Sequence, residues 1–560
     1  MKAKKILAVL MMFLILAAAL VGCGDGAGSQ SPGGGSQADE DLMDPWSPYP
    51  ETVVITTARS YDPKHKWGPE QSMEHNLLTD MIKEQLNVEY QILWQVESTE
   101  FLNKLSLNLA AGDIPDTFTI HGVNDYLFYR ELVDNGMLAD LSEAYDKCAG
   151  EYMSEVFDTY EGRNLEPYYE GDALYAIASG QYGYGHSLLW VRKDWLDQVG
   201  LDVPMTIEEI EEVLRAFVDQ NVGGNNLGFS LDAVNPIGRY ASGFTGNAIF
   251  YALHAYPNQW LRDDEGNVYW GTIAPEVKDG LEILARWYQE GLIDKQFMTR
   301  TNSGEKEALI SSGQTGIWFG WWGFPWSMGD LYKTDPDLEL VAVQAPLDAD
   351  GNYSHLWPAP AAQAVVVSKD CANPEAVIKT INVEFNIWRG FDAENKKILD
   401  DFDPDGLYDQ NWDNMFPTGG FNLEYNNIIP SVGQLAKDMI EAGTSDVPGH
   451  PHNTQHDRNM AQSAMEYAQG IKPDGWADYY TRYIGSNVAA ESGTIIYNEF
   501  PFSTESMADL KPNLDKLTNE TFLKIIVGEL PVDYFDEFVE QWKAQGGDVL
   551  TQEVQAMLDR

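Results

Sequence analysis

The stretches ETVVITTA at residues 51–58 and VEYQILWQ at residues 88–95 decide the fold. Both are short runs rich in Val, Ile, Thr and Tyr, which is typical of buried β-strands. Between them, residues 72–86 have the apolar spacing of a helix. A strand, a helix and a second strand form a β-α-β unit, in which the two strands run parallel.

The elements that follow continue this alternation. The sequence predicts a helix at residues 99–112, for which Gly112 is a suitable C-terminal cap, and a third strand at residues 117–120. We therefore expect an α/β fold with a largely parallel sheet, whose ligand sites lie at the carboxyl ends of its strands. This places His121 and Asn124 close to a cleft.

The N-terminus has the pattern of a secretory signal. Lysines precede an apolar run at residues 6–21, and this run is shorter than the about 20 residues that cross a bilayer. The ending Leu-Val-Gly-Cys resembles a bacterial lipobox, which implies cleavage before Cys23 and acylation of its sulfur. Residues 24–50 begin with Gly and Ser and predict a flexible linker. We expect the rest of the chain to lie outside the cell membrane, attached by lipid alone.

Length and composition narrow the class of protein. The chain has 560 residues, more than one core normally serves, so we expect at least two lobes. Its 36 basic and 87 acidic residues give a net charge of −51, which disfavours nucleic acid and anionic lipid as partners. The charge also disfavours a polyanionic ligand, although a small basic pocket stays open. Cys148 and Cys371 are expected as free thiols, and a disulfide between them stays open.

The segment LSLNLAAGDIPDTF at residues 105–118 resembles extracellular solute-binding proteins of ATP-binding-cassette importers, in their sugar and oligosaccharide branch. Further segments resemble the family in the same order along the chain: residues 189–204, 206–220, 277–292, 307–319, 374–382 and 534–547. Independently of the resemblance, residues 206–220 predict the start of a helix, because Thr206 and Glu209 form a capping box. Residues 400–480 show little resemblance.

The resemblance implies a fold, a function and partners. The fold is a two-lobed, type II periplasmic-binding-protein-like α/β fold with a hinge. We expect lobe 1 at residues 51–170 with about 345–400, and lobe 2 at about 171–344 with about 401–560. The implied function is capture of an oligosaccharide or glycan fragment between the lobes and delivery to a membrane permease. We expect a monomer without a cofactor.

The densest aromatic stretch is GIWFGWWGFPW at residues 316–326. A flat indole matches the C–H face of a sugar ring, while the sugar hydroxyls need polar partners. The resemblance places a sugar-stacking tryptophan after this strand, and that role falls on Trp322 with Trp321 beside it. Trp326 is a further candidate. For Trp318, which lies on the strand, we favour a place in the core.

Other candidate ligand-binding residues lie in loops rich in Gly, Pro or Asn. The loop QYGYGH at residues 181–186 offers two tyrosines, although it reads equally well as a simple connection between lobes. These further candidates are Tyr182, Tyr184, Arg239, Trp357 and Trp412.

Two sequence patterns resemble metal sites, and for each of them we favour an interpretation without a metal ion. Residues 401–406 fit the opening of a calcium loop, with candidate ligands Asp401, Asp403, Asp405 and Asp409. However, Trp412 stands where a bidentate Glu is needed, so an acidic turn is the favoured interpretation. The histidines of GHPHNTQH, residues 449–456, lack a fixing carboxylate or cysteine, and we favour a solvated segment over a zinc site.

Enzyme motifs are lacking in the sequence: it contains no G-x-S-x-G, H-E-x-x-H or P-loop. We therefore expect a binding protein and not an enzyme. The alternative is a surface glycoside hydrolase or polysaccharide lyase, in which the same aromatic residues would line a catalytic groove. The sequence leaves open which sugar, linkage and chain length are bound.

Overall fold

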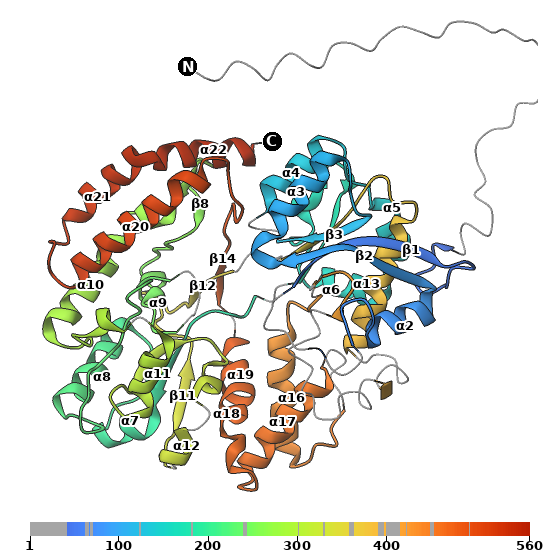
Figure 1. Cartoon of the computed structure of the whole chain (residues 1–560). Helices are drawn as coiled ribbons and strands as arrows, with labels where there is room; N and C mark the ends of the chain where they lie inside the picture. Colours follow the sequence, from blue (N-terminus) through green and yellow to red (C-terminus); the bar gives the residue numbers. More distant parts are fainter. Residues whose placement is uncertain are drawn as a thin grey trace, which may run out of the picture. The chain divides into compact units, whose positions relative to one another are not determined.

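The computed structural model describes residues 42–559, apart from residues 62–66, 68–70, 122–124, 181–182, 239–242, 301, 329–330, 336, 358–362, 390–396, 399–414, 420, 422, 449–452 and 492. The predicted signal segment with Cys23 and the linker up to residue 41 lie outside the described residues. Two sheets organise the described part of the chain (Figure 1).

The first sheet has five strands in the order β2-β1-β3-β13-β6. They are β1 (Val53–Tyr61), β2 (Val88–Glu97), β3 (Thr117–Ile120), β6 (Ala176–Ala178) and β13 (Ala364–Val367). β1 runs parallel to β2 and β3, which confirms the predicted β-α-β unit with α2 (Leu77–Leu86) between its strands. β13 lies antiparallel between β3 and β6, so the chain returns to this sheet after a long excursion.

Helices cover the first sheet. α13 (Pro374–Arg389) packs against α2, α5 (Ser142–Cys148) and α6 (Glu151–Asp158). α3 (Phe101–Ala111) contacts β1 and β2, and ends as predicted at Gly112, whose φ of 78° is left-handed. Cys148 and Cys371 are both buried free thiols, as expected.

The second sheet has the order β10-β7-β11, and its strands are β7 (Leu188–Arg192), β10 (Ile317–Gly320) and β11 (Leu340–Val343). Both neighbours run antiparallel to β7, so the prediction of a largely parallel sheet is wrong for this part of the chain. The connections between these strands are long and allow either direction, and therefore the alternation of elements does not fix it. α8 (Ile207–Asp219) has the predicted capping box between Thr206 and Glu209.

The two faces of the second sheet belong to different hydrophobic cores, because successive side chains of a strand point to opposite faces. Leu188 and Trp190 of β7 belong to the core that also fills the first sheet's side. Leu189 and Val191, the alternate residues, belong to the core beneath α8 and α10 (Val277–Glu290). Trp318 is fully buried in the first of these cores, which confirms the prediction for this residue.

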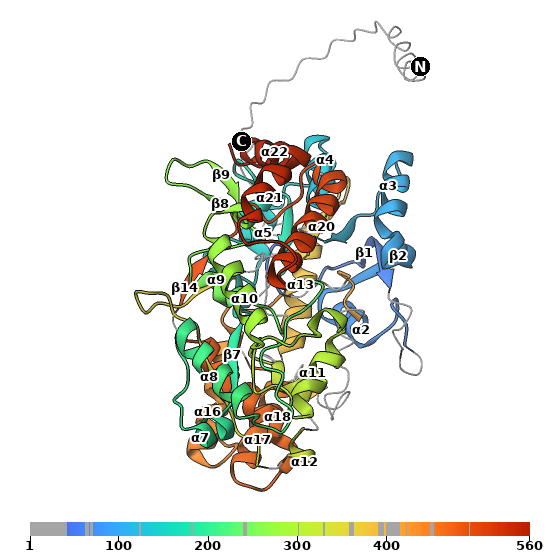
Figure 2. The same ribbon diagram turned by 90° about the vertical axis from the view of Figure 1, so that its left-hand side faces the viewer.

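The C-terminal part of the chain is helical. α16 (Ile428–Ala442), α17 (Gln455–Ala468), α18 (Trp476–Asp478) and α19 (Ser486–Ala489) form one group with the π-helix at Tyr479–Gly485. α20 (Met507–Ile526), α21 (Tyr534–Trp542) and α22 (Asp548–Leu558) form another, in which α20 packs against α10 and α22 against β9 (Val268–Trp270), as Figure 2 also shows.

Chain segments cross between the two sheets. Residues 179–187 join β6 to β7, and residues 344–363 join β11 to β13. In the second crossing, β12 (Ser354–Leu356) pairs in parallel with β14 (Thr494–Ile496). Of the remaining elements, α4 (Tyr126–Asp134) and β8 (Trp260–Arg262) contribute to the site. Further elements are α7 (Lys193–Val199), α9 (Asn247–Tyr251), α11 (Ser303–Ser311), α12 (Leu331–Thr334), β4 (Tyr169–Glu170) and β5 (Ala173–Leu174).

Residues 42–50, the last part of the expected linker, lie against the body: Tyr49 is buried in the first core, and Leu42 and Met43 pack against that core. The ammonium group of Lys379 on α13 donates to the backbone carbonyls of Leu42 at 3.0 Å and Ser47 at 2.6 Å. One buried cation therefore holds this segment at two points, Leu42 and Ser47.

Candidate functional site

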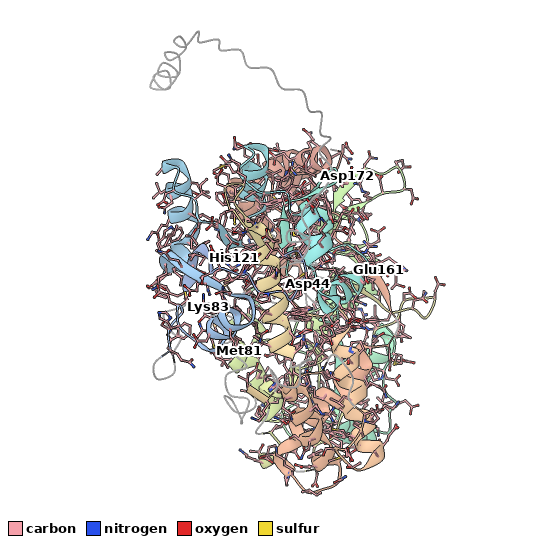
Figure 3. All side chains as sticks on the ribbon, turned by 90° about the vertical axis from the view of Figure 1, so that its right-hand side faces the viewer. Asp44, Met81, Lys83, His121, Glu161 and Asp172 are labelled. Carbon is pink, nitrogen blue, oxygen red and sulfur yellow. The ribbon has the colours of Figure 1, made fainter. Side chains whose placement is uncertain are left out.

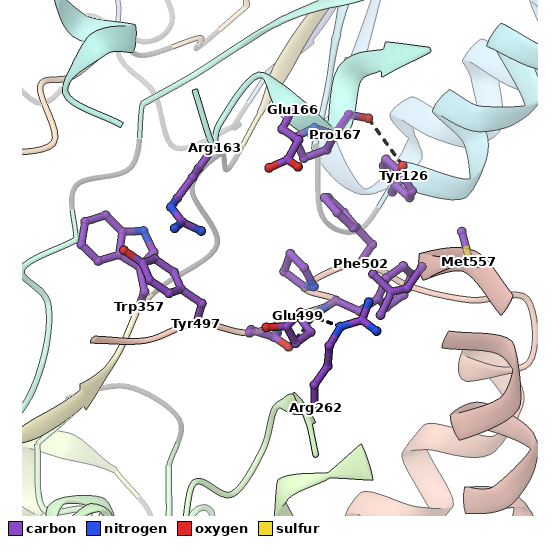
Figure 4. Close-up of a pocket in the computed structure, with 14 residues that line it drawn as sticks. Tyr126, Arg163, Glu166, Pro167, Arg262, Trp357, Tyr497, Glu499, Phe502 and Met557 are labelled. Atoms are coloured by element: carbon purple, nitrogen blue, oxygen red, sulfur yellow. Dashed lines mark hydrogen bonds and ion pairs between the residues drawn. The ribbon is translucent and has the colours of Figure 1, made fainter. Parts of the chain in front are cut away.

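A cavity of about 480 Å³ lies between the first-sheet side and the second-sheet side of the protein (Figure 4). Its lining residues come from the start of α4, the turn after α6, β8, the residue after β12, the segment after β14 and the end of α22. They are Tyr126, Arg163, Glu166, Pro167, Arg262, Trp357, Tyr497, Asn498, Glu499, Phe500, Pro501, Phe502, Met557 and Leu558. We refer to it as the interlobe cavity.

The first wall of the interlobe cavity follows from the first sheet. Tyr126 opens α4, shortly beyond the carboxyl end of β3, where the sequence predicted a ligand site. Its hydroxyl donates to the carbonyl of Pro167 at 3.5 Å, and burial raises its pKa. Arg163 and Glu166 lie in the turn after α6, and both side chains are exposed.

The second wall is the segment after β14, which is fastened to β8. The side chain of Asn498 accepts a hydrogen bond from the backbone of Trp260 at 3.0 Å. The backbone of Glu499 donates to the carbonyl of Trp260, also at 3.0 Å. The carboxylate of Glu499 pairs with Arg262 Nε at 3.0 Å. These bonds fix the backbone of residues 498–499, so the side chains on either side project from a defined position.

Two aromatic contacts join the walls. The rings of Tyr126 and Phe502 stack with centroids 4.0 Å apart and an angle of 21° between their planes. The guanidinium of Arg163 lies 3.9 Å from the ring centroid of Tyr497. The interlobe cavity thus combines aromatic faces with charged and amide groups, which is the lining that a polar molecule with apolar faces requires.

Among the predicted site residues that the structure describes, Trp357 lines the interlobe cavity. Its ring lies 5.8 Å from that of Tyr497, and it is 8% exposed. The backbone of Gly183 lies directly against it, because a Cβ at that glycine would come 2.1 Å from the indole. The loop that begins at residue 181 therefore depends on glycine for this close approach.

The predicted tryptophans form a separate cluster. Trp321, Trp322 and Trp326 meet edge to face, with centroids 5.0, 5.4 and 6.1 Å apart. The guanidinium of Arg482 lies 4.9 Å from the ring of Trp326 and 5.5 Å from that of Trp322, and it pairs with Asp457 at 3.1 Å. The cluster thereby connects the end of β10 to the helical group formed by α16 to α19.

The burial of these indoles differs from one to the next. Trp322 is only 3% exposed, so it offers no open face in this structure, contrary to the projecting ring that the sequence suggested. The π-helix contacts both its ring and its backbone, since Arg482 lies over the ring and Gly485 lies close to the backbone carbonyl. Trp321 and Trp326 are half-buried, and Trp326 donates its indole N–H to Asp478 at 3.1 Å. A sugar-stacking role for the three stays a prediction.

The other predicted residues have varied positions. His121 is exposed at the end of β3 (Figure 3), and its backbone N–H donates to buried Asp125 at 2.9 Å. Tyr184 is half-buried, and burial raises its pKa. The remaining candidates lie outside the described residues: Asn124, Tyr182, Arg239, Trp412, Asp401, Asp403, Asp405 and Asp409.

Sequence reasoning missed most of the cavity lining. Arg163, Tyr497 and Phe502 were not singled out. The segment NEFPF at residues 498–502 carried a usable signal, because aromatic residues around a proline after a strand are the pattern noticed at residues 316–326. No local signal marked Arg163.

Metal binding and membrane spanning are two further properties that bear on function. Within the described ranges, His, Cys, Asp and Glu side chains form no group of three or more that could hold a metal ion. In the same part of the chain, none of the helices is long and apolar enough to cross a membrane.

Comparison with known proteins identifies the class. The family described as bacterial extracellular solute-binding protein matches residues 83–383, more than half of the chain. The protein belongs to this family.

Its relatives include sugar-binding proteins. It is 22% identical over 476 residues to the polygalacturonan/rhamnogalacturonan-binding protein YtcQ of Bacillus subtilis, covering 84% of this chain and 86% of the relative. It is 24% identical over 248 residues to the fructooligosaccharide ABC transporter substrate-binding protein FusA of Streptococcus pneumoniae, covering 41% and 43%. Lipoprotein LipO of Bacillus subtilis is 20% identical over 502 residues, covering 87% and 89%.

Solved structures share the two-lobed fold. An extracellular solute-binding protein from Bifidobacterium longum subsp. infantis has a TM-score of 0.59 at 16% identity, covering 91% of this chain and 98% of that one. A human-milk-oligosaccharide (HMO) binding solute-binding protein from Bifidobacterium longum infantis has a TM-score of 0.56 at 16% identity, covering 91% and 99%. These likenesses confirm the expected α/β class with two lobes.

Proposed function

We propose that this protein is the substrate-binding subunit of an ATP-binding-cassette importer and binds an oligosaccharide between its two lobes. The observation that carries the proposal is the interlobe cavity, whose aromatic residues come from both walls. Family membership and the carbohydrate ligands named for YtcQ and FusA support the same function.

The proposed mechanism is binding without chemical change. Sugar rings lie against the aromatic faces, and polar groups of the cavity take the hydroxyls. The lobes close about the crossing segments, and the closed form docks on a permease in the membrane. We propose lobe 1 as residues 51–170 with about 345–400 and lobe 2 as about 171–344 with about 401–560.

The ligand surface includes the predicted residues as well as the cavity lining. We keep Trp321, Trp322 and Trp326 as candidates, together with Tyr184 and His121. For Trp322, contact with a sugar requires the cover by the π-helix to open.

We also propose that acylated Cys23 anchors the protein as a monomer on the outer face of the cell membrane. The relationship to Lipoprotein LipO supports an anchor. Mass spectrometry of the protein from membranes tests it: the mature N-terminus should be a diacylglycerol-modified Cys23, and a Cys23→Ala variant should lose that mass.

The test of function is incubation of the purified protein with a panel of oligosaccharides. We expect calorimetry to show binding of at least one, and chromatography to recover that ligand unchanged. New reducing ends would identify an enzyme, and an absence of binding across neutral and acidic glycans would refute the proposal.

A further inference from the structure

The interlobe cavity contains two arginines in a protein whose net charge is −51. The two arginines differ in their interactions. Arg262 forms an ion pair with Glu499 at 3.0 Å and donates a hydrogen bond to the carbonyl of Gly266 at 2.9 Å. Arg163 forms no ion pair with any described residue, and its recorded side-chain contact is the face of Tyr497. One cationic group of the cavity is therefore still available.

The geometry of Arg163 leaves its donors accessible. The central carbon of its guanidinium lies over the ring of Tyr497, 3.9 Å from the ring centroid, within the range of a cation–π contact. Its N–H groups lie in the guanidinium plane and point outward at its edge. Figure 4 shows this side chain extending over Tyr497 into the open part of the cavity. The aromatic contact thus orients the cation without using its hydrogen-bonding edge.

A second donor lies at the same end. The indole nitrogen of Trp357 is buried and has no hydrogen-bond partner among the described residues. The indole ring lies next to the ring of Tyr497, and the guanidinium of Arg163 lies over that tyrosine ring. Glu166 lines the same wall, and the negative charge of its carboxylate opposes the binding of an anionic ligand.

We propose that Arg163 binds the carboxylate of an acidic sugar residue, and that the oligosaccharide taken by this protein contains uronic acid. This inference rests on the proposed function and adds its substrate class. A carboxylate accepts two parallel hydrogen bonds from a guanidinium edge, and such charge-assisted bonds are stronger than those to a neutral hydroxyl. Tyr497 beneath Arg163 keeps the guanidinium in one orientation.

The test compares two trisaccharides that differ only at C6, where one has a carboxylate and the other a hydroxymethyl group: α-1,4-linked trigalacturonate and its carboxyl-reduced counterpart, α-1,4-linked galactotriose. Calorimetry measures their affinities for the wild-type protein, Arg163→Gln and Arg215→Gln. Arg215 is the control, because it lies on α8, pairs with Glu211 and Glu290 and does not line the cavity.

We expect the wild type to bind the acidic trisaccharide at least about tenfold more tightly than the neutral one. Arg163→Gln should remove that preference, whereas Arg215→Gln should keep it. A further variant, Glu166→Gln, should strengthen acidic binding. Since Arg163 is exposed, Arg163→Gln should keep the melting temperature of the wild type.

The outcomes separate the two proposals. Preference for the neutral trisaccharide, or an acidic preference that survives in Arg163→Gln, overturns this inference while oligosaccharide binding stands. Binding of neither trisaccharide overturns this inference, and the proposed function falls with it when the wider panel of oligosaccharides also fails to bind.

Discussion

His186 and His355 stack inside the segments that cross between the two sheets, with ring centroids 4.1 Å apart. Both are nearly fully buried. Burial lowers the pKa of His355 to about 4. Burial, with a smaller contribution from His355, also lowers the pKa of His186 well below its usual value. Two neutral imidazoles therefore form part of the connection between the lobes.

This pair predicts acid sensitivity. Because the folded pKa lies below the unfolded value near 6.5, the stability gained by burying the neutral ring is fully present above pH 6.5 and is lost as the pH falls through about 4. His355→Phe keeps a flat ring without a titrating group. We expect its loss of stability between pH 6.5 and pH 4 to be smaller than that of the wild type by roughly 2 kcal/mol.

Urea unfolding across this pH range provides the measurement. His75→Asn, which replaces an exposed histidine, is the control and should follow the wild type. Equal acid sensitivity in His355→Phe and the wild type would show that the stacked pair does not cause it.

Glu384 predicts the opposite dependence on pH. Its buried carboxylate accepts hydrogen bonds from the backbone and hydroxyl of Thr418, at 3.3 and 2.7 Å, and burial raises its pKa to about 8. This value exceeds the unfolded value of 4.5. The stability that the buried, protonated carboxyl of Glu384 contributes is therefore fully present below pH 4.5 and is lost as the pH rises through about 8. Glu384→Gln should therefore lose less stability from pH 5 to pH 8 than the wild type, by on the order of 3 kcal/mol.

Melting temperatures at pH 5 and pH 8 measure this difference. Glu143→Gln, at an exposed position on α5, should behave as the wild type does. If Glu384→Gln and the wild type lose the same stability towards pH 8, the carboxyl of Glu384 titrates normally.

Gly183 offers a test of the contact with Trp357. In Gly183→Ala the new methyl group would come 2.1 Å from the indole, so the loop or the ring must move. We expect a loss of roughly 1–3 kcal/mol of folding stability and weaker ligand binding. Gly185→Ala is a matched control in the same loop, because a Cβ there meets nothing within 4 Å.

Chemical denaturation and calorimetry measure both quantities in both variants. A Gly183→Ala protein as stable as Gly185→Ala, and with wild-type affinity, would mean that the loop does not need this close approach.

In the tryptophan cluster, we expect replacement of a buried indole by Ala to cost more folding stability than replacement of a half-buried one. Trp318→Ala and Trp322→Ala should each cost roughly 3–5 kcal/mol of stability, since both rings are buried in the core. Trp321→Ala should cost less, because its ring is half-buried. Urea unfolding measures this, and a Trp322→Ala protein with wild-type stability would place that indole on an open surface.

Local features of the fold were predictable from the sequence. Apolar periodicity predicted β1, α2 and β2, and the capping box at Thr206 predicted the start of α8. The pairing of β13 with β3 was not predictable, because those strands are distant in the sequence and no turn fixes their register. The antiparallel direction of the second sheet was missed for the same reason.

The site was predicted only in part, and for a related physical reason. Trp357 was chosen from its local surroundings. Arg163 gains its role from Tyr497, and Tyr126 gains its role from Phe502, so each contact joins residues that the fold alone brings together. The burial of Trp322 likewise depends on the π-helix that contains Gly485.

The central claim, that an oligosaccharide occupies the interlobe cavity, is tested most directly by the calorimetric affinity of wild type and Tyr497→Ala for the tightest-binding oligosaccharide. The ring of Tyr497 lines that cavity and supports Arg163. Our account predicts that the wild type binds and that Tyr497→Ala binds about tenfold more weakly or worse while remaining folded. Equal affinities in the two proteins would contradict it.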